Sequence, residues 1–220
     1  MPIYKVFDKT FFKKWSRDVA YILGFLFADG NIVKTKRNTH FMAIYSADFD
    51  LMFSMREAIG SNHKIGIRNI ETGGVYVIQI GSKELFHDLG RFGLSPNKAK
   101  RMRIPEIPEK YVSDFIRGYF DGDGCVWYGL VHKNRTKLAT VLRVCFTSAS
   151  FEFLSGLLSL LKCRGIIGGS LFRSKKGNYS RLQFGMLNSL KIYEIMYNAP
   201  HRLFLGRKKL VFEKCMKMRS

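Results

Sequence analysis

Acidic residues are scarce in this 220-residue chain: 17 Asp plus Glu stand against 37 Lys plus Arg, and the formal net charge is +20. Such a balance points to a polyanionic partner, either a nucleic acid or an acidic membrane surface. Hydrophobic residues make up 46% of the sequence and aromatic residues 14%. The chain can therefore build a substantial core and is not a disordered basic tail.

Recognisable cysteine and histidine metal motifs are missing. The two residue types form no ligand cluster with each other, and no pair of cysteines has CxxC spacing among Cys125, Cys145, Cys163 and Cys215. We therefore expect no zinc site and a reducing, intracellular setting.

Long hydrophobic runs are also absent. No stretch approaches about 18 uninterrupted apolar residues, and the N-terminal sequence MPIYKVFDKTFFKKWSRD lacks the apolar core of a signal peptide. No sustained amphipathic basic helix supports a membrane-surface role, so we expect no membrane partner. The expected location is a bacterial or archaeal cytoplasm, or the matrix of a mitochondrion or chloroplast.

Two similar segments divide the chain. YILGFLFADG at residues 21–30 and FIRGYFDGDG at 115–124 each consist of a bulky apolar run with an internal glycine, followed by an acid and a glycine. Their spacing of 94 positions is typical of a duplicated half-domain rather than a solenoid unit. Pro105 and Pro108 interrupt regular structure between the copies. We therefore predict two repeats, residues 1–104 and 105–220.

The segments after each copy also match. Residues 31–46 and 125–148 each indicate a strand, a basic turn and a second strand, followed by a helix that Asp48 or Ser150 could cap. A further hairpin ends near Gly81 in the first half and near Gly185 in the second. Each half thus predicts helix, two strands, helix, two strands, helix.

The paired segments resemble the motifs of LAGLIDADG homing endonucleases of the single-chain, two-repeat kind. This resemblance covers nearly the whole chain and implies an α+β fold of two pseudo-symmetric αββαββα repeats, each with a curved antiparallel sheet that forms a DNA-binding saddle, packed through the two motif helices. Within the nine-residue pattern, both copies keep the glycine at position three, the acid at position eight and the final glycine. The departures from the pattern are Leu23, Phe27 and Arg117.

The motif suggests how a metal site would form. Gly24 and Gly118 would let the two helices approach closely, which brings Asp29 and Asp123 together at the negative poles of two helix dipoles. Such a site should recruit Mg²⁺, a hard cation that binds oxygen ligands. The resemblance implies two or more ions, with Ca²⁺ supporting binding without cleavage. It also implies that the carbonyls of Ala28 and Gly122 face the metals, and we expect left-handed helix stops at the glycines that follow the acids.

A basic group near each scissile phosphate would neutralise developing charge. The family places a lysine late in each half, and the best matches are Lys98 and Lys208. Lys100, Arg207 and Lys209 remain alternatives.

Each sheet would present one free face to the DNA major groove. The two faces differ in sequence, so the resemblance implies an asymmetric double-stranded target of roughly 20 base pairs, bound by a monomer. The candidate DNA-binding residues are Lys34, Lys36, His40, Arg68 and Gln79 in the first half, and His132, Asn134, Lys137, Arg143, Arg173, Arg181 and Gln183 in the second.

The expected function is a Mg²⁺-dependent endodeoxyribonuclease that makes a double-strand break with short 3′ overhangs. Two alternatives share the fold: a maturase that binds intron RNA, and a catalytically silent DNA-binding protein. Retention of both Asp29 and Asp123 favours cleavage, because a silent regulator would be expected to lack one or both acids.

Overall fold

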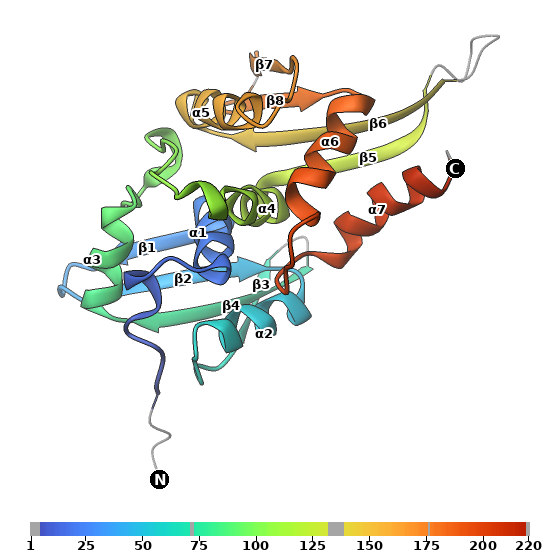
Figure 1. Ribbon diagram of the computed structural model, residues 1–220. Helices are drawn as coiled ribbons and strands as arrows, with labels where there is room; N and C mark the ends of the chain where they lie inside the picture. Colours follow the sequence, from blue (N-terminus) through green and yellow to red (C-terminus); the bar gives the residue numbers. More distant parts are fainter. Residues whose placement is uncertain (1–4, 71–72, 132–138, 176, 219–220) are drawn as a thin grey trace.

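The computed structural model describes residues 5–70, 73–131, 139–175 and 177–218. Two four-stranded antiparallel sheets flank a central pair of helices, and the remaining helices lie against the sheets (Figure 1). This arrangement confirms the predicted α+β fold of two repeats. Among the described residues, no helix is long and apolar enough to cross a membrane.

The first repeat has the predicted order of elements. It contains α1 (Arg17–Asp29), β1 (Gly30–Lys34), β2 (His40–Ser46), α2 (Phe49–Ala58), β3 (Gly66–Ile70), β4 (Gly73–Gly81) and α3 (Lys83–Arg91). Its strands lie in the order β1-β2-β4-β3.

The second repeat adds one helix to that plan. It contains α4 (Val112–Asp123), β5 (Gly124–Val131), β6 (Ala139–Ser148), α5 (Phe151–Lys162), β7 (Ser170–Arg173), β8 (Ser180–Phe184), α6 (Met186–Tyr197) and α7 (Gly206–Lys217). The strand order is β5-β6-β8-β7, equivalent to that of the first sheet. The sequence pattern predicts a single helix at the end of this repeat, whereas the structure has α7 after α6. In the first repeat a short 3₁₀ turn, Lys98–Lys100, follows α3 instead.

Side-chain caps start the helices where the sequence predicts them. Asp48 accepts a hydrogen bond from the Leu51 amide at 3.0 Å, and Ser150 accepts one from the Phe153 amide at 3.1 Å. These caps satisfy amides that the first helical turn leaves unpaired. Both predicted caps are confirmed.

The motif helices end differently from our expectation. Gly30 and Gly124 have φ angles of −102° and −88°, so each is extended rather than left-handed, and each helix passes directly into a strand. The glycines are needed for space: a Cβ on Gly30 would overlap Leu26, and one on Gly124 would overlap Phe120.

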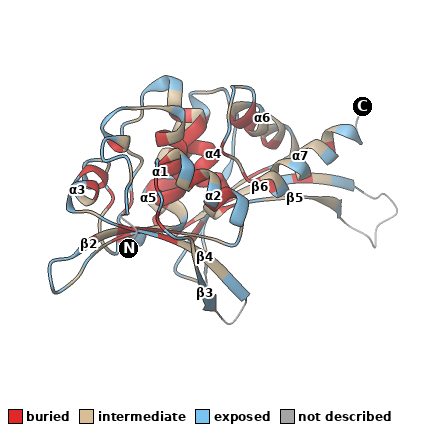
Figure 2. Ribbon diagram, turned by 90° about the horizontal axis from the view of Figure 1, so that it is seen from below, coloured by how far each residue is buried: buried red, intermediate tan, exposed pale blue. Residues whose placement is uncertain are grey.

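The centre of the molecule is the contact between α1 and α4. A Cβ on Gly24 would overlap the carbonyl oxygen of Phe115, and a Cβ on Gly118 would overlap that of Tyr21. The two backbones therefore touch, as the motif predicts. Figure 2 shows that buried residues concentrate in these two helices.

Each sheet packs one face against helices. Met42 and Ile44 of β2 are fully buried, as are Val144 and Phe146 of β6, because alternate residues of a strand point to the same side. The other side of each sheet carries exposed residues in the described part of the chain, such as Gln79 in the first sheet and Arg143 in the second. The fold thus places two open sheet faces on either side of the ends of α1 and α4.

Candidate active site and nucleic-acid interface

Two carboxylates lie at the adjoining ends of the central helices. Asp29 is the last residue of α1 and Asp123 the last of α4, and an Asp29 carboxylate oxygen lies 3.4 Å from where a Cβ on Gly122 would stand. Burial and the negative charge of Asp29 raise the pKa of Asp123 to about 6. Desolvation also raises the pKa of Asp29, although its side chain reaches solvent. The structure therefore brings these two predicted residues together.

Lys98 reaches the end of α1 from a short 3₁₀ turn. Its buried Nζ donates to the carbonyl oxygens of Phe27 at 2.9 Å and Ala28 at 3.3 Å. Asn97 precedes it with a left-handed φ of 57°, which turns the chain toward the helix end. Burial lowers the pKa of Lys98 to about 8, against the opposing effect of Asp123 and Asp29.

Lys208 occupies the equivalent place at the end of α4. Burial lowers its pKa to about 8, while the charge of Asp121 acts in the opposite direction. Its Nζ donates to carbonyl oxygens at 2.7, 2.8, 3.3 and 2.6 Å, which belong to Phe120, Asp121, Gly122 and Gly124, respectively.

The alternative basic residues lie elsewhere. Lys100 and Arg207 are exposed, and the ammonium group of Lys209 lies over the rings of Tyr197 and Phe204. Of the candidates, Lys98 and Lys208 are the lysines that the fold brings to the ends of the two motif helices.

Asp121, at position six of the second motif, is a buried residue that our site prediction did not include. Its carboxylate accepts hydrogen bonds from the Tyr21 hydroxyl at 2.7 Å and from the Leu205 amide at 2.8 Å. Burial raises its pKa to about 6. Asp121 thus connects α1, α4 and the start of α7, the helix that carries Lys208. In the first motif the same position holds Phe27, which packs against Phe115 and Phe153.

Arg117, another departure from the motif pattern, has a structural role. Its guanidinium is fully buried and pairs with Asp114 at 2.6 Å. It also donates to the carbonyl oxygens of Leu203 at 2.9 Å and Met196 at 2.7 Å. Arg117 therefore holds the segment between α6 and α7 against the central helices.

The donor set fits a hard divalent cation. Among the described residues no group of three or more His, Cys, Asp or Glu side chains could hold a metal ion, so the ligands would be two carboxylates and main-chain carbonyls. The carbonyls of Ala28 and Gly122 accept long, 3.3 Å bonds from the lysines. Each carbonyl oxygen has two lone pairs, so these bonds do not exhaust it. Oxygen ligands around partly repelling carboxylates suit Mg²⁺ or Ca²⁺ rather than a soft metal.

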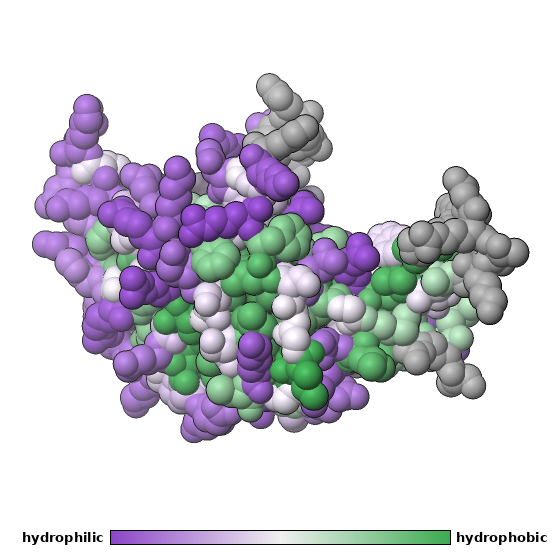
Figure 3. Space-filling view, turned by 90° about the horizontal axis from the view of Figure 1, so that it is seen from above, coloured by the Kyte–Doolittle hydropathy of each residue, from purple (hydrophilic) through white to green (hydrophobic). Residues whose placement is uncertain are grey.

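The sheet registers decide which predicted DNA-binding residues face outward. Arg68 is opposite Val75, and Gln79 is opposite Ala43, on the side away from buried Ile78 and Ile80. Arg143, Arg181 and Gln183 lie on the corresponding face of the second sheet, and Lys36 lies exposed in the turn after β1. Figure 3 shows hydrophilic residues crowding the upper and left parts of the molecule in that view.

Three candidates do not lie on the open faces. Lys34 is opposite His40 on the side that carries buried Ile32 and Met42, and His40 is buried against the ring of Phe86 in α3. Lys34 is exposed because it ends its strand.

Arg173 is the third candidate that does not lie on an open sheet face. It is opposite Ser180, its guanidinium lies over the ring of Phe151 in α5, and it is 3.9 Å from Glu152. The error is one of strand parity, because a shift of one residue exchanges the two faces. His132, Asn134 and Lys137 lie outside the described residues.

Two aromatic residues on the open face were missed. Trp127 is opposite Arg143, and Phe172 is opposite Arg181; their side chains are 44% and 43% exposed. The signal was available, since Trp127 alternates with the inward-facing Val126 and Tyr128.

Known proteins share this fold. Residues 110–211 match the family model of a LAGLIDADG-like domain. The meganuclease I-SmaMI bound to uncleavable DNA has a TM-score of 0.64 and 14% identity, covering 93% of this chain and 89% of that chain. The structure of mesophilic variants of the homing endonuclease I-DmoI has a TM-score of 0.58 and 17% identity, covering 84% of this chain and 98% of that chain. The structure of I-LtrWI, a LAGLIDADG homing endonuclease bound to target DNA, has a TM-score of 0.59 and 13% identity, covering 91% of each chain.

Curated relatives are longer proteins. A probable translation initiation factor IF-2 of Thermococcus kodakarensis is 33% identical over 162 residues, which are 70% of this chain but 12% of that protein. An uncharacterised protein of Methanocaldococcus jannaschii is 27% identical over 184 residues, which are 80% of this chain and 60% of that protein. The chain thus spans less than two thirds of either relative.

Fold and site together define a protein of two pseudo-symmetric repeats that join at paired acidic helix ends, with an open sheet face in each repeat. The match over residues 110–211 and the fold similarity over most of the chain then confirm the resemblance found in the sequence. The chain therefore has the two-repeat fold of single-chain LAGLIDADG homing endonucleases, and its residues 110–211 match the model of a LAGLIDADG-like domain.

Proposed function

We propose that this protein is a site-specific DNA endonuclease that hydrolyses one phosphodiester bond in each strand of a duplex. The observation that supports the proposal best is the meeting of Asp29 and Asp123 at helix ends where Lys98 and Lys208 are buried. A catalytically silent DNA-binding protein would need neither the paired acids nor the paired lysines. The known structures with this fold include I-SmaMI and I-LtrWI, each bound to DNA.

Asp29, Asp123 and the carbonyls of Ala28 and Gly122 would hold the metal. Mg²⁺, when bound there, would supply positive charge to the scissile phosphate and increase the acidity of an attacking water. Lys98 and Lys208 have pKa values lowered by burial to about 8, so each can hold or release a proton near neutral pH. As ammonium groups, they would stabilise the charge that develops on a phosphate oxygen.

Two repeats would give one acid and one lysine from each half, and hence cleavage of both strands. The resemblance to LAGLIDADG homing endonucleases implies that the break has short 3′ overhangs. The open faces carry different residues: Gln79 stands beside Ala43 in the first sheet, whereas Gln183 stands beside Cys145 in the second. A monomer would therefore recognise an asymmetric target of roughly 20 base pairs.

Selection from a randomised duplex library tests this proposal. The protein is incubated with the library and Mg²⁺, and the ends of cleaved molecules are sequenced. We expect a long asymmetric consensus with staggered ends, and no cleavage in Ca²⁺ although binding persists. The control, Asp29→Asn, should bind in Ca²⁺ yet nick at most one strand. A library that is bound in Ca²⁺ but never cut in Mg²⁺ would contradict the proposal.

A further inference from the structure

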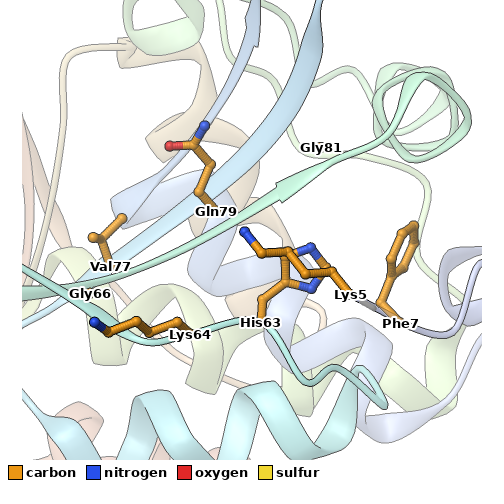
Figure 4. Close-up of a pocket in the computed structure, with 8 residues that line it drawn as sticks. All are labelled: Lys5, Phe7, His63, Lys64, Gly66, Val77, Gln79 and Gly81. Carbon is orange, nitrogen blue, oxygen red and sulfur yellow. The ribbon is translucent and has the colours of Figure 1, made fainter. Parts of the chain in front are cut away.

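A pocket of about 610 Å³ lies beside the first sheet, outside the site of the paired acids (Figure 4). Three parts of the chain form it: the N-terminal arm with Lys5 and Phe7, the loop between α2 and β3 with His63 and Lys64, and strand β4 with Val77 and Gln79. Gln79 belongs to the open face of the sheet, so a ligand lying on that face passes the mouth of this pocket.

The N-terminal arm is fixed to the loop that follows α2. The Asp8 amide donates to the Ile59 carbonyl at 3.0 Å. The Val6 amide donates to the Asn62 side-chain oxygen at 2.7 Å, and the Asn62 amide returns a bond to the Val6 carbonyl at 3.2 Å. These bonds place Lys5 at the pocket despite the distance in sequence from Lys64.

Charge makes the pocket a site for an anion. Lys5 and Lys64 are exposed at the pocket, and none of the described residues that line it is Asp or Glu. His63 is buried against Ser61, and burial together with the charge of Lys5 lowers the pKa of His63, which favours the neutral imidazole. The two lysines therefore supply the positive charge, and the neighbouring Gln79 supplies an amide on the same face.

We propose that Lys5 and Lys64 bind a backbone phosphate of duplex DNA at this pocket, next to the base pair that faces Gln79. The inference rests on the proposed DNA-binding function and extends it beyond the sheets to the N-terminal arm. Phosphate contacts fix the register of a protein on DNA without reading sequence. This contact would therefore determine which base pair Gln79 meets.

In the described part of the second repeat, the position that corresponds to Lys64 holds no lysine. Continuing the β3–β4 register by two residues puts Lys64 opposite Gln79, because Gly66 is opposite Val77. In the second sheet the residue opposite the matching Gln183 is Ser170. The phosphate contact therefore belongs to one half of the target only.

Two double variants of the full chain test the inference. Lys5→Ala/Lys64→Ala removes the lysines of the pocket, and Lys162→Ala/Lys214→Ala removes the same charge from exposed positions on α5 and α7. Affinity for a mixed-sequence duplex longer than two helical turns is measured in Ca²⁺ at several salt concentrations. One lost phosphate contact should make the slope of log K against log salt shallower by about 0.9. The control slope should match that of the unmodified protein.

Phosphate ethylation interference on the selected target locates the contact. We expect one phosphate, in one half-site, whose ethylation weakens the unmodified protein but not Lys5→Ala/Lys64→Ala. Equal slopes for both double variants, or an unchanged ethylation pattern, would overturn this inference and leave the proposed function intact. Failure of the unmodified protein to bind any duplex would overturn both.

Discussion

Replacing Asp123 by Asn should stabilise the metal-free protein at neutral pH. The carboxylate lies beside Asp29 at the negative end of a helix, and its pKa is raised from 3.8 to about 6. Such a shift means that the fold disfavours the ionised group. Asn keeps the shape of the side chain and removes the charge.

The pH dependence follows from the direction of the shift. A pKa that is higher in the folded state gives stability that is fully present below the unfolded value, near pH 4, and is lost as pH rises through about 6. A shift of about two units corresponds to about 3 kcal/mol. Partial exposure of the group to solvent reduces the expected effect to about 1–2 kcal/mol.

Urea denaturation of the unmodified protein and Asp123→Asn, in EDTA across pH 4 to 8, measures this difference. The two proteins should have similar free energies of unfolding near pH 4, and the variant should be more stable above about pH 6. Mg²⁺ should then stabilise the unmodified protein, because the ion binds the folded state alone. It should have little effect on Asp123→Asn, because that variant lacks one of the two carboxylate ligands.

A lower stability of Asp123→Asn at pH 7.5, or equal stabilisation of both proteins by Mg²⁺, would refute this reasoning. The first result would mean that the attraction of the Asp123 carboxylate to Lys98 and Lys208 exceeds its repulsion by Asp29 and the cost of its desolvation. The second would place the ion elsewhere on the protein.

Two further predictions concern Lys208 and the contact between α1 and α4. Lys208→Met should slow cleavage of at least one strand by about 10²–10³-fold, with affinity for DNA in Ca²⁺ retained, whereas Lys209→Met should leave the cleavage rate unchanged. Single-turnover cleavage of end-labelled DNA measures both rates. Equal rates for the two variants would exclude a catalytic role for Lys208. Gly118→Ala should lower the free energy of unfolding by about 1–3 kcal/mol or more, because its Cβ meets the Tyr21 carbonyl. Gly90→Ala on α3, where a Cβ meets nothing within 4 Å, should be neutral or stabilising in the same denaturation assay.

Local and repeated signals explain what the sequence could predict. The two motifs, the caps at Asp48 and Ser150 and the alternation along the strands each depend on neighbouring residues, and the duplication allowed each to be checked against its copy. Lys98 and Lys208 were found because the family pattern supplied their approximate positions. Their contacts with helix carbonyls could not have been derived from composition or spacing.

Long-range and parity-dependent features were harder to predict. His40 and Arg173 were assigned to the wrong face, because the face of a short strand depends on which residue begins the alternation. Asp121 bonds to Tyr21 and to the start of α7, partners that are 100 and 84 positions away. Lys5 reaches the first sheet only because the N-terminal arm bonds to the loop after α2.

The burial of Lys98 and Lys208 has a consequence for the paired acids. Carbonyls at the C-terminal ends of α1 and α4 carry negative partial charge in addition to the charges of Asp29 and Asp123. The lysines donate to those carbonyls and form no ion pair with the acids among the described residues. They thereby offset the negative potential of the helix ends while the carboxylates remain available. A protein that paired these lysines directly with the acids would gain stability but would occupy the ligands that a divalent cation needs.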